Sequence, residues 1–322
     1  MRATRMVLLL VLSAVCVSSA GAQSWPTKTV TVIVGYPAGG GTDVIARFLA
    51  EGLRERTGQP FLVENRPGIF GNLGAQYVSH AKPDGYTVLF TPNSTHAVNV
   101  HLFKKLGYDP VKDFTPVATV VSAGFVLLVN PAAVPVSSVS GLTEYIKARP
   151  SALAYGVNAA TGRIASELYL SLAGGLKMTF IPYKSANDAL MDLLRGQIHF
   201  FFADAMFAMP QMRGGKVRAI AVSNDKRFLF AQDIPTMAEG GLPGYDVPTW
   251  FALFMPAKAP REIAQKVAEL SNAIMATEKG RDFLKNLGAD PFPGDPDSLA
   301  KLVETEIPKW GRLVKSAGIE AE

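Results

Sequence analysis

Cysteine is almost missing from this 322-residue sequence. The single one, Cys16, lies near the N-terminus, so the rest of the chain can form no disulfide and contains no C-x-x-C motif. A chain of this length has enough residues for a hydrophobic core that needs no covalent cross-link. The sequence therefore predicts one or two ordinary globular domains and not a small disulfide-bonded scaffold.

An excess of charge of one sign is also missing. The formal net charge is +5, and removal of Arg2 and Arg5 with an N-terminal leader would take two from that value. So small an excess does not favour nucleic acid or an anionic membrane surface as a partner. We therefore expect no nucleic-acid and no membrane-surface binding.

Motifs for catalysis and for metal binding are absent. The sequence contains no G-x-S-x-G nucleophile elbow and no H-E-x-x-H pair, and its four histidines lack the spacing of metal ligands. We predict no catalytic residue, no metal and no cofactor. The alternative is an exported enzyme in which His199 or Asp204 acts as a general base on an organic acid.

Long hydrophobic runs are limited to the N-terminus. The run from Met6 to Val17 follows Arg2 and Arg5 and precedes an A-x-A pattern at residues 20–22. It is shorter than the roughly 20 residues that span a bilayer. The pattern predicts a cleaved signal peptide over residues 1–22 and a periplasmic location.

Strand-like and helix-like segments alternate along the rest of the chain, which is typical of a layered α/β fold with largely parallel strands. The first series predicts strands at residues 29–36, 61–64 and 87–91, with helices from Asp43 to before Gly58 and at 72–81. A second series begins near Gly124. Its strands are predicted at 125–130, 153–157, 178–183, 198–204 and 217–223, and its helices at 139–149, from about Arg163, and at 186–196. A strand at 250–255 and helices near Pro260 and Pro296 follow.

The two series predict two lobes. Residues 23–123 together with 246–322 would form lobe 1, and residues 124–245 would form lobe 2. Each lobe is expected to be a mostly parallel sheet flanked by helices, and crossover strands would join the lobes.

The segment YPAGGGTD, residues 36–43, joins the first predicted strand to the first predicted helix. Its glycines let the backbone approach a ligand closely, and the start of the helix offers unpaired N–H groups. No lysine follows as in a Walker loop, and Val44 stands where a G-x-G-x-x-G fingerprint requires glycine. The segment predicts a site for an anion or an ordered water. The alternative is a tight turn whose helix is capped by Thr42 or Asp43.

A second loop of the same kind lies in YGVNAATGRIASELY, residues 155–169. Asn158, Thr161 and Gly162 could hold a carboxylate through neutral donors. Arg163 either adds a charge-assisted contact or is a solvated residue of the first helical turn. The two loops follow strands, and ligands of open α/β sheets bind at the carboxyl ends of strands.

Two more segments contain candidate residues. TPNSTH, residues 91–96, offers Ser94 as a ligand donor or as an ordinary turn residue. In IHFFFAD, residues 198–204, Phe202 is either strand core or an apolar wall of a pocket. Asp204 either faces the cleft or caps the next helix.

Five segments together resemble one known family. They are YPAGGGTDVIAR, ENRPGIFGNLGAQYVSHAKPDGYTVLF, IPYKSANDALMDLLRGQIHFFFADA, GGKVRAIAVS and PGYDVPTWFALFMPAKAP. In this order, and across essentially the whole mature chain, they are similar to the Bug proteins, the periplasmic solute receptors of tripartite tricarboxylate transporters. The resemblance implies a two-lobed periplasmic binding protein that closes about a hinge, captures a small carboxylate and delivers it to a membrane permease.

The resemblance also implies site residues. In this family the first loop holds one end of the ligand, often through ordered waters, and the loop of the second lobe holds a carboxylate by backbone amides and a hydroxyl. It thereby implies contacts by Ala38, Gly39, Thr42, Asp43, Thr161 and Gly162. With the residues argued from the sequence itself, the candidate set is Tyr36, Ala38, Gly39, Thr42, Asp43, Ser94, Asn158, Thr161, Gly162, Arg163, Phe202 and Asp204.

Three departures from the family pattern leave the ligand open. The chain has RIASE where many relatives resemble HLAGE, His199 where an acidic residue is common, and FFAD in place of MFD. Arg163 could pair with a second carboxylate, which would make the ligand a dicarboxylate, and an aromatic one if the Phe-rich strand and Trp250 line the site. We expect a monomer whose partner is the permease, with a sensor kinase as the alternative.

Overall fold

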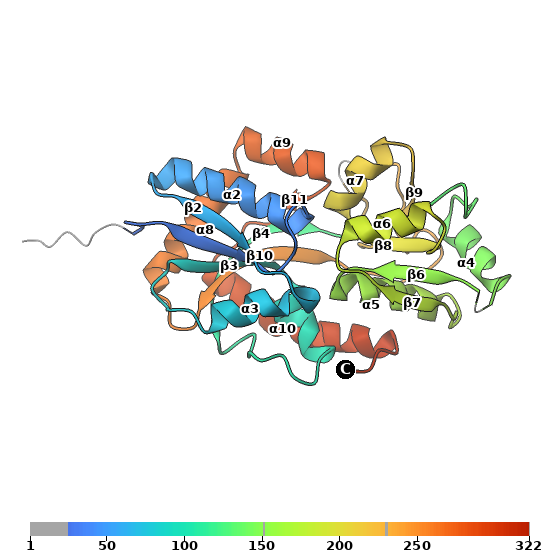
Figure 1. Cartoon of the computed structure of the whole chain (residues 1–322), viewed down its shortest axis with the longest axis horizontal. Coiled ribbons are helices and arrows are strands. Elements are labelled where there is room, and N and C mark those ends of the chain that lie inside the picture. The colour runs from blue at the N-terminus through green and yellow to red at the C-terminus, as the bar shows by residue number, and fades with distance from the viewer. Residues whose placement is uncertain (1–24, 151, 229–230, 322) are drawn as a thin grey trace, which may run out of the picture.

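The computed structural model describes residues 25–150, 152–228 and 231–321, and it contains two sheets that lie side by side along the long axis of the molecule (Figure 1). The predicted signal peptide lies outside the described residues. Each sheet is flanked by helices, so the predicted two-lobed α/β class is confirmed.

The first lobe is built on a six-stranded sheet in the order β11-β4-β10-β3-β1-β2. Its strands are β1 (Val30–Val34), β2 (Phe61–Asn65), β3 (Thr87–Pro92), β4 (Phe114–Ala123), β10 (Thr249–Pro256) and β11 (Asp290–Pro291). β1 pairs in parallel with β2 and β3, whereas β10 runs antiparallel to β3 and β4.

The second lobe is built on a five-stranded sheet in the order β7-β6-β8-β5-β9. Its strands are β5 (Phe125–Val129), β6 (Ala154–Val157), β7 (Thr179–Pro182), β8 (Phe200–Asp204) and β9 (Arg218–Val222). β6 pairs in parallel with β7 and β8, and β5 runs antiparallel to β8 and β9.

Most strands of each sheet run in one direction, as expected, and the exceptions are β10 and β11 in the first sheet and β5 in the second. The antiparallel members β10 and β5 are the strands through which the chain enters each lobe from the other one. Each of these two strands runs antiparallel to both of its neighbours in the sheet.

The helices match the predicted ones closely, with three differences. They are α2 (Gly41–Thr57), α3 (Asn72–Ser79), α4 (Val139–Lys147), α5 (Ala160–Leu172), α6 (Ala186–Leu194), α7 (Ala205–Arg213), α8 (Arg261–Met275), α9 (Glu278–Leu287) and α10 (Pro296–Ser316), with short turns η1 (Ile69–Gly71), η2 (Ser94–Val98) and η3 (Asn99–His101). Helix α5 begins at Ala160, three residues before the expected start, and α7 and α9 were not predicted. Helices α2 and α9 cover one face of the first sheet, and α3 and α10 cover the other (Figure 1).

Two connections between the lobes lie next to each other. One is Gly124, between β4 and β5, and the other is the segment between β9 and β10. Ser223 links them, because its Oγ accepts a hydrogen bond from Phe125 N at 2.8 Å and donates one to Val247 O at 2.7 Å. A Cβ on Gly124 would lie 1.7 Å from Asn224 Oδ1, so the crossing has no room for a larger residue unless Asn224 moves.

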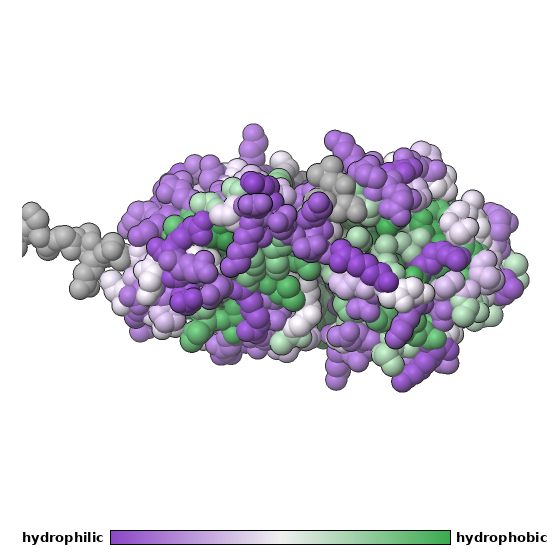
Figure 2. All heavy atoms as spheres, turned by 90° about the horizontal axis from the view of Figure 1, so that it is seen from above, coloured by the Kyte–Doolittle hydropathy of each residue, from purple (hydrophilic) through white to green (hydrophobic). Residues whose placement is uncertain are grey.

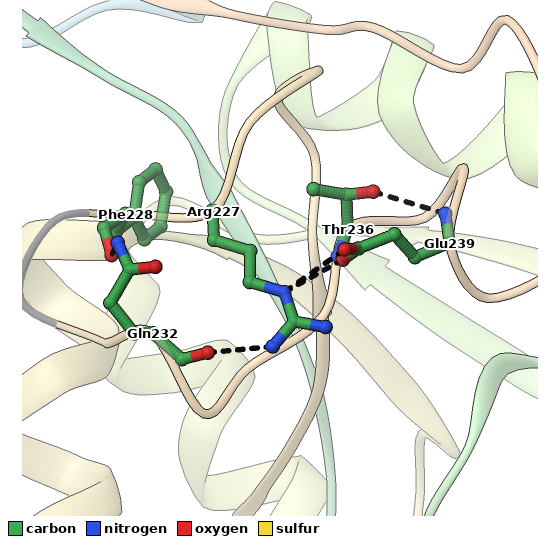
Figure 3. A network of polar contacts seen from close by, with 5 residues as sticks. All are labelled: Arg227, Phe228, Gln232, Thr236 and Glu239. Atoms are coloured by element: carbon green, nitrogen blue, oxygen red, sulfur yellow. Dashed lines mark hydrogen bonds and ion pairs between the residues drawn. The ribbon is translucent and has the colours of Figure 1, made fainter.

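The return connection is held in shape by its own side chains (Figure 3). Glu239 accepts hydrogen bonds from Arg227 Nε at 2.8 Å and from Thr236 N at 2.7 Å. Arg227 also donates to Gln232 O at 2.7 Å. These bonds satisfy backbone groups that no strand or helix pairs.

Within the first lobe, helix α10 is hydrogen-bonded to strand β10. Glu306 accepts hydrogen bonds from Trp250 Nε1 at 3.2 Å and from Trp310 Nε1 at 2.7 Å, and all three side chains are buried. At its C-terminal end the helix also reaches the second lobe, where Ser171 Oγ donates to Ser316 O. Within the described ranges, no helix is both long enough and apolar enough to cross a bilayer.

Candidate functional site

A pocket lies between the two lobes, at the carboxyl ends of β1, β6, β7 and β8. Counted out to its opening, and including the solvent there, its empty space is about 770 Å³. It is lined by Tyr36, Pro37, Ala38, Gly40, Gly41, Thr42, Pro92, Ser94, Phe125, Asn158, Ala159, Thr161, Lys184, Ser185, Ala186, Asn187, Asp204, Phe207, Thr249 and Phe251. On the face seen from above, hydrophobic residues reach the surface beside the junction of the lobes (Figure 2).

The first wall is the start of helix α2. The N-cap residue, Gly40, has extended backbone and offers no side chain to accept from the first helical turn. The N–H groups of that turn therefore point to the pocket without a side-chain cap. Gly39 precedes them with φ of 82°, a left-handed conformation that favours glycine.

Asp43 fixes this loop from behind and does not line the pocket. One carboxylate oxygen accepts hydrogen bonds from Gly39 N and from Arg47 Nε, each at 2.9 Å, and the other accepts from Asn65 Nδ2 at 2.9 Å. Burial opposes ionisation, but these bonds hold the pKa of Asp43 below its ordinary value. Asp43 is therefore an anion that shapes the loop.

The opposite wall is the start of helix α5. Its N-cap residue, Ala159, also provides no side-chain acceptor. Thr161 lies in the first turn and is buried, and its Oγ1 is 3.0 Å from Ser94 Oγ, which belongs to the first lobe. The base of the pocket is thus a hydroxyl pair formed by both lobes.

Two more helices, α6 and α7, begin at the pocket, and they differ from α2 and α5 because N-cap side chains cap them. Ser185 accepts from Asp188 N at the start of α6, and Asp204 Oδ1 accepts from Phe207 N at the start of α7. The first-turn donors that lack side-chain caps at this pocket are therefore those of α2 and α5. One comes from each lobe, and each carries the partial positive charge of a helix N-terminus.

Asp204 lines the pocket and caps α7, so both of its expected roles are observed. Burial raises its pKa to about 6, although backbone hydrogen bonds oppose the rise. The side chain lies close to the start of α2, because a Cβ on Gly41 would be 2.9 Å from Asp204 Oδ1. Asp204 of the second lobe thus brings a carboxyl group with a pKa of about 6 close to the start of α2.

Besides Asp43, the first loop contains one more ionisable residue, Tyr36. Its hydroxyl donates to Phe70 O at 3.2 Å. Burial raises the pKa of Tyr36 well above its ordinary value, so the side chain stays neutral.

The structure brings together seven of the twelve candidate residues from the sequence. Tyr36, Ala38, Thr42, Ser94, Asn158, Thr161 and Asp204 line the pocket. Gly39, Asp43, Gly162, Arg163 and Phe202 do not.

The physical reasons for the five exclusions differ. Gly39 turns the chain behind Gly40, and Asp43 accepts its N–H. Gly162 faces Phe125 and the carbonyl of Phe202, and Phe202 itself is buried and stacked on Tyr245 at 6.2 Å. The guanidinium of Arg163 lies over the ring of Phe180, with 4.8 Å to its centroid.

Several lining residues were not among the candidates. Lys184, Ser185, Ala186 and Asn187 form the loop after β7, and the strand-end rule that selected the other loops applies to it as well. Phe125, Thr249 and Phe251 come from the strands that cross between the lobes, and only their topology places them at the pocket.

The histidines lie away from the pocket. His96 is buried and stacked on Phe254 with 3.6 Å between ring centroids, and burial lowers its pKa to about 3. His199 contacts the backbone of Ala154. Within the described part of the chain, no group of three or more His, Cys, Asp or Glu residues could hold a metal ion.

Most of the chain matches a family of transport receptors. Residues 45–319 match the family described as tripartite tricarboxylate transporter family receptor. The chain is 31% identical to protein BugT of Bordetella pertussis, over 92% of this chain and 91% of BugT.

Three solved structures are also similar. One is an R. palustris protein determined with adipate, which is 36% identical with a TM-score of 0.89 and covers 92% of this chain and 100% of that chain. MatC from Rhodopseudomonas palustris with bound malate is 33% identical with a TM-score of 0.83, over 90% and 100% of the two chains. The periplasmic binding protein BugD is 30% identical with a TM-score of 0.86, over 92% and 100%.

Proposed function

Because the chain belongs to the receptor family of the tripartite tricarboxylate transporters, we propose that it captures a small carboxylate between its lobes in the periplasm and delivers it to the membrane permease. The observation that carries this proposal is the meeting of two helix N-termini without side-chain caps, one from each lobe, at one pocket.

A carboxylate that leaves water must regain its hydrogen bonds inside the pocket. The first-turn N–H groups of α2 and α5 and the hydroxyls of Thr42, Ser94 and Thr161 are suitable donors. A ligand bound to both helices contacts both lobes, so it stabilises the state in which the lobes are closed over it. Binding and closure are then one equilibrium.

The ligand is proposed to be a dicarboxylate. Adipate and malate, the molecules in two of the similar structures, each carry two carboxylates. Phe125, Phe207 and Phe251 add apolar surface to the pocket, which suits a carbon skeleton between polar ends.

The proposal includes the division of the chain. Residues 23–123 with 246–322 form lobe 1, and residues 124–245 form lobe 2. The chain passes from one sheet to the other after β4 and again after β9, which is compatible with these bounds. Residues 1–22 are a signal peptide removed on export. The receptor is a monomer, with a sensor kinase as the alternative partner.

Thr161→Ala tests the site. We expect this variant to bind adipate about five- to tenfold more weakly than the unchanged protein, because one buried donor is lost. Titration calorimetry measures the affinity, and thermal unfolding without ligand checks that the fold is kept. Thr143→Ala is the matched control, since Thr143 bonds Tyr169 on the same lobe away from the pocket. Equal affinities of all three proteins would remove Thr161 from the site.

Incubation with the bound acid separates a receptor from an enzyme. We expect the acid to be recovered unchanged by mass spectrometry after prolonged contact with the pure protein. Any product, abolished in Asp204→Asn, would instead support the exported enzyme.

A further inference from the structure

We infer that Lys184 recognises a second carboxylate of the ligand at the mouth of the pocket. The inference rests on the proposed function and narrows it to linear dicarboxylates with a carboxylate at each end. It also replaces Arg163 in that role, because the guanidinium of Arg163 lies over Phe180 and does not line the pocket.

Lys184 is placed by anchored neighbours. It follows strand β7, and Ser185 next to it caps α6 by accepting from Asp188 N at 3.2 Å. On the other side, Tyr183 OH donates to Asp192 Oδ2 at 2.9 Å. The backbone of Lys184 is therefore held at the pocket, while its exposed side chain keeps a flexible four-carbon stem.

Lys184 is the only lysine, arginine or histidine among the described residues that line the pocket. In the same described set it forms no ion pair, in contrast to many other surface cations of this chain. Asp204, the acidic residue of the lining, accepts from the first turn of α7. The ammonium group of Lys184 is thus available to an anionic ligand.

The arrangement of the lining separates two polar ends. The buried first-turn residues Thr42 and Thr161, together with the hydroxyl of Ser94, form one end between the lobes. The rings of Phe125, Phe207 and Phe251 would leave a second carboxylate without partners if it lay among them. We therefore place that carboxylate at the solvated side, where the exposed Lys184 lies beside Ser185 and Asn187.

The experiment compares acids of equal length. α,ω-Dicarboxylates of four to eight carbons and the matching monocarboxylates are titrated into the unchanged protein, Lys184→Gln, Lys184→Arg and the control Lys177→Gln. Lys177 is an exposed lysine of the same lobe that does not line the pocket. We expect Lys184→Gln to weaken binding of the best dicarboxylate about two- to fivefold and to leave binding of its monocarboxylate unchanged, since an exposed ion pair contributes modestly.

The other variants and the effect of salt test whether the positive charge at position 184 causes the preference for the dicarboxylate. Lys184→Arg and Lys177→Gln should keep the preference for the dicarboxylate, and added salt should reduce that preference in the unchanged protein more than in Lys184→Gln. Equal loss for both acids, or an intact preference in Lys184→Gln, overturns the role of Lys184 and leaves the receptor function standing. Binding of none of the acids by the unchanged protein overturns the proposed function itself.

Discussion

Asp204 places a group that titrates near neutral pH in a pocket proposed for an anion. Its pKa is raised to about 6 by burial, so the side chain is ionised at pH 8 and largely protonated at pH 5. An ionised Asp204 repels a carboxylate and a protonated one can donate to it. We expect the affinity for the ligand to rise severalfold as the pH falls from 8 to 5.

Asp204→Asn is the matched variant, because asparagine also caps helices. We expect it to flatten the pH dependence of binding in calorimetric titrations, and comparison at each pH cancels protonation of the acid itself. The stability of the ligand-free protein should depend on the protonation of the same carboxyl group, that of Asp204. A folded pKa above the unfolded one gives stability that is present below about pH 4 and lost as the pH rises through about 6. Identical pH profiles of variant and unchanged protein would contradict this role.

The chemical character of the site could be predicted from single residues, but its full membership could not. Asn158 and Thr161, selected as small polar residues after a predicted strand, line the pocket, and so do Ala38 and Thr42, which the family resemblance implied. Asp43 directly follows a lining residue and Arg163 lies two residues after one, yet a helix turns successive side chains by about 100°, so they face other partners. To predict which way these side chains face, the start of each helix must be known to within one residue.

At the scale of elements, the carboxylate of Glu306 joins helix α10 to the crossing strand β10. It accepts from two buried indole groups, Trp250 and Trp310, and lies 3.2 Å from Lys309. Glu306→Ala would leave both indole N–H groups buried without an acceptor. We expect it to lower the free energy of unfolding by about 2–4 kcal/mol, measured by urea denaturation.

The control for this prediction is Glu306→Gln, which keeps one acceptor oxygen and the side-chain volume. It should cost less than the alanine variant, by about 1 kcal/mol or more. If both variants unfold at the same urea concentration as the unchanged protein, the two indoles find other partners and the proposed link is wrong.

The elements that escaped prediction have physical reasons in common. Strand β4 contains Pro116, which is rare inside a sheet, and the pairing with β10 shifts register there, between Leu253 and Phe254. Helix α7 contains Pro210, and α9 is short and mostly polar. Strand β11 has only two residues, Asp290–Pro291, too few to show a period. Periodicity predicted the remaining strands and the long helices.

At the scale of the whole molecule, the two-lobed division was predictable because the strand, loop and helix series occurs twice. The antiparallel pairing of the entering strands β5 and β10 was not, since pairing partners depend on long-range topology. That pairing places Phe125 and Thr249 at the pocket, and Gly124 lies next to Asn224 at the only two crossings between the sheets in the described ranges. We propose this junction as the hinge.

Gly124→Ala tests the hinge by adding one methyl group. The new Cβ would lie 1.7 Å from Asn224 Oδ1 and 3.1 Å from Ser223 Oγ, so Asn224 must give up its 3.4 Å bond to Ala123 O and the crossings must separate. We expect a loss of about 1–2 kcal/mol in unfolding free energy, as for other overpacked sites, together with weaker ligand binding. Removing the obstacle in the double variant Gly124→Ala, Asn224→Ala should restore both, whereas Asn224→Ala alone should change little. The two effects must recover together if closure turns on this junction, because ligand affinity includes the free energy of closing the lobes. Recovery of stability without recovery of affinity would place the hinge elsewhere.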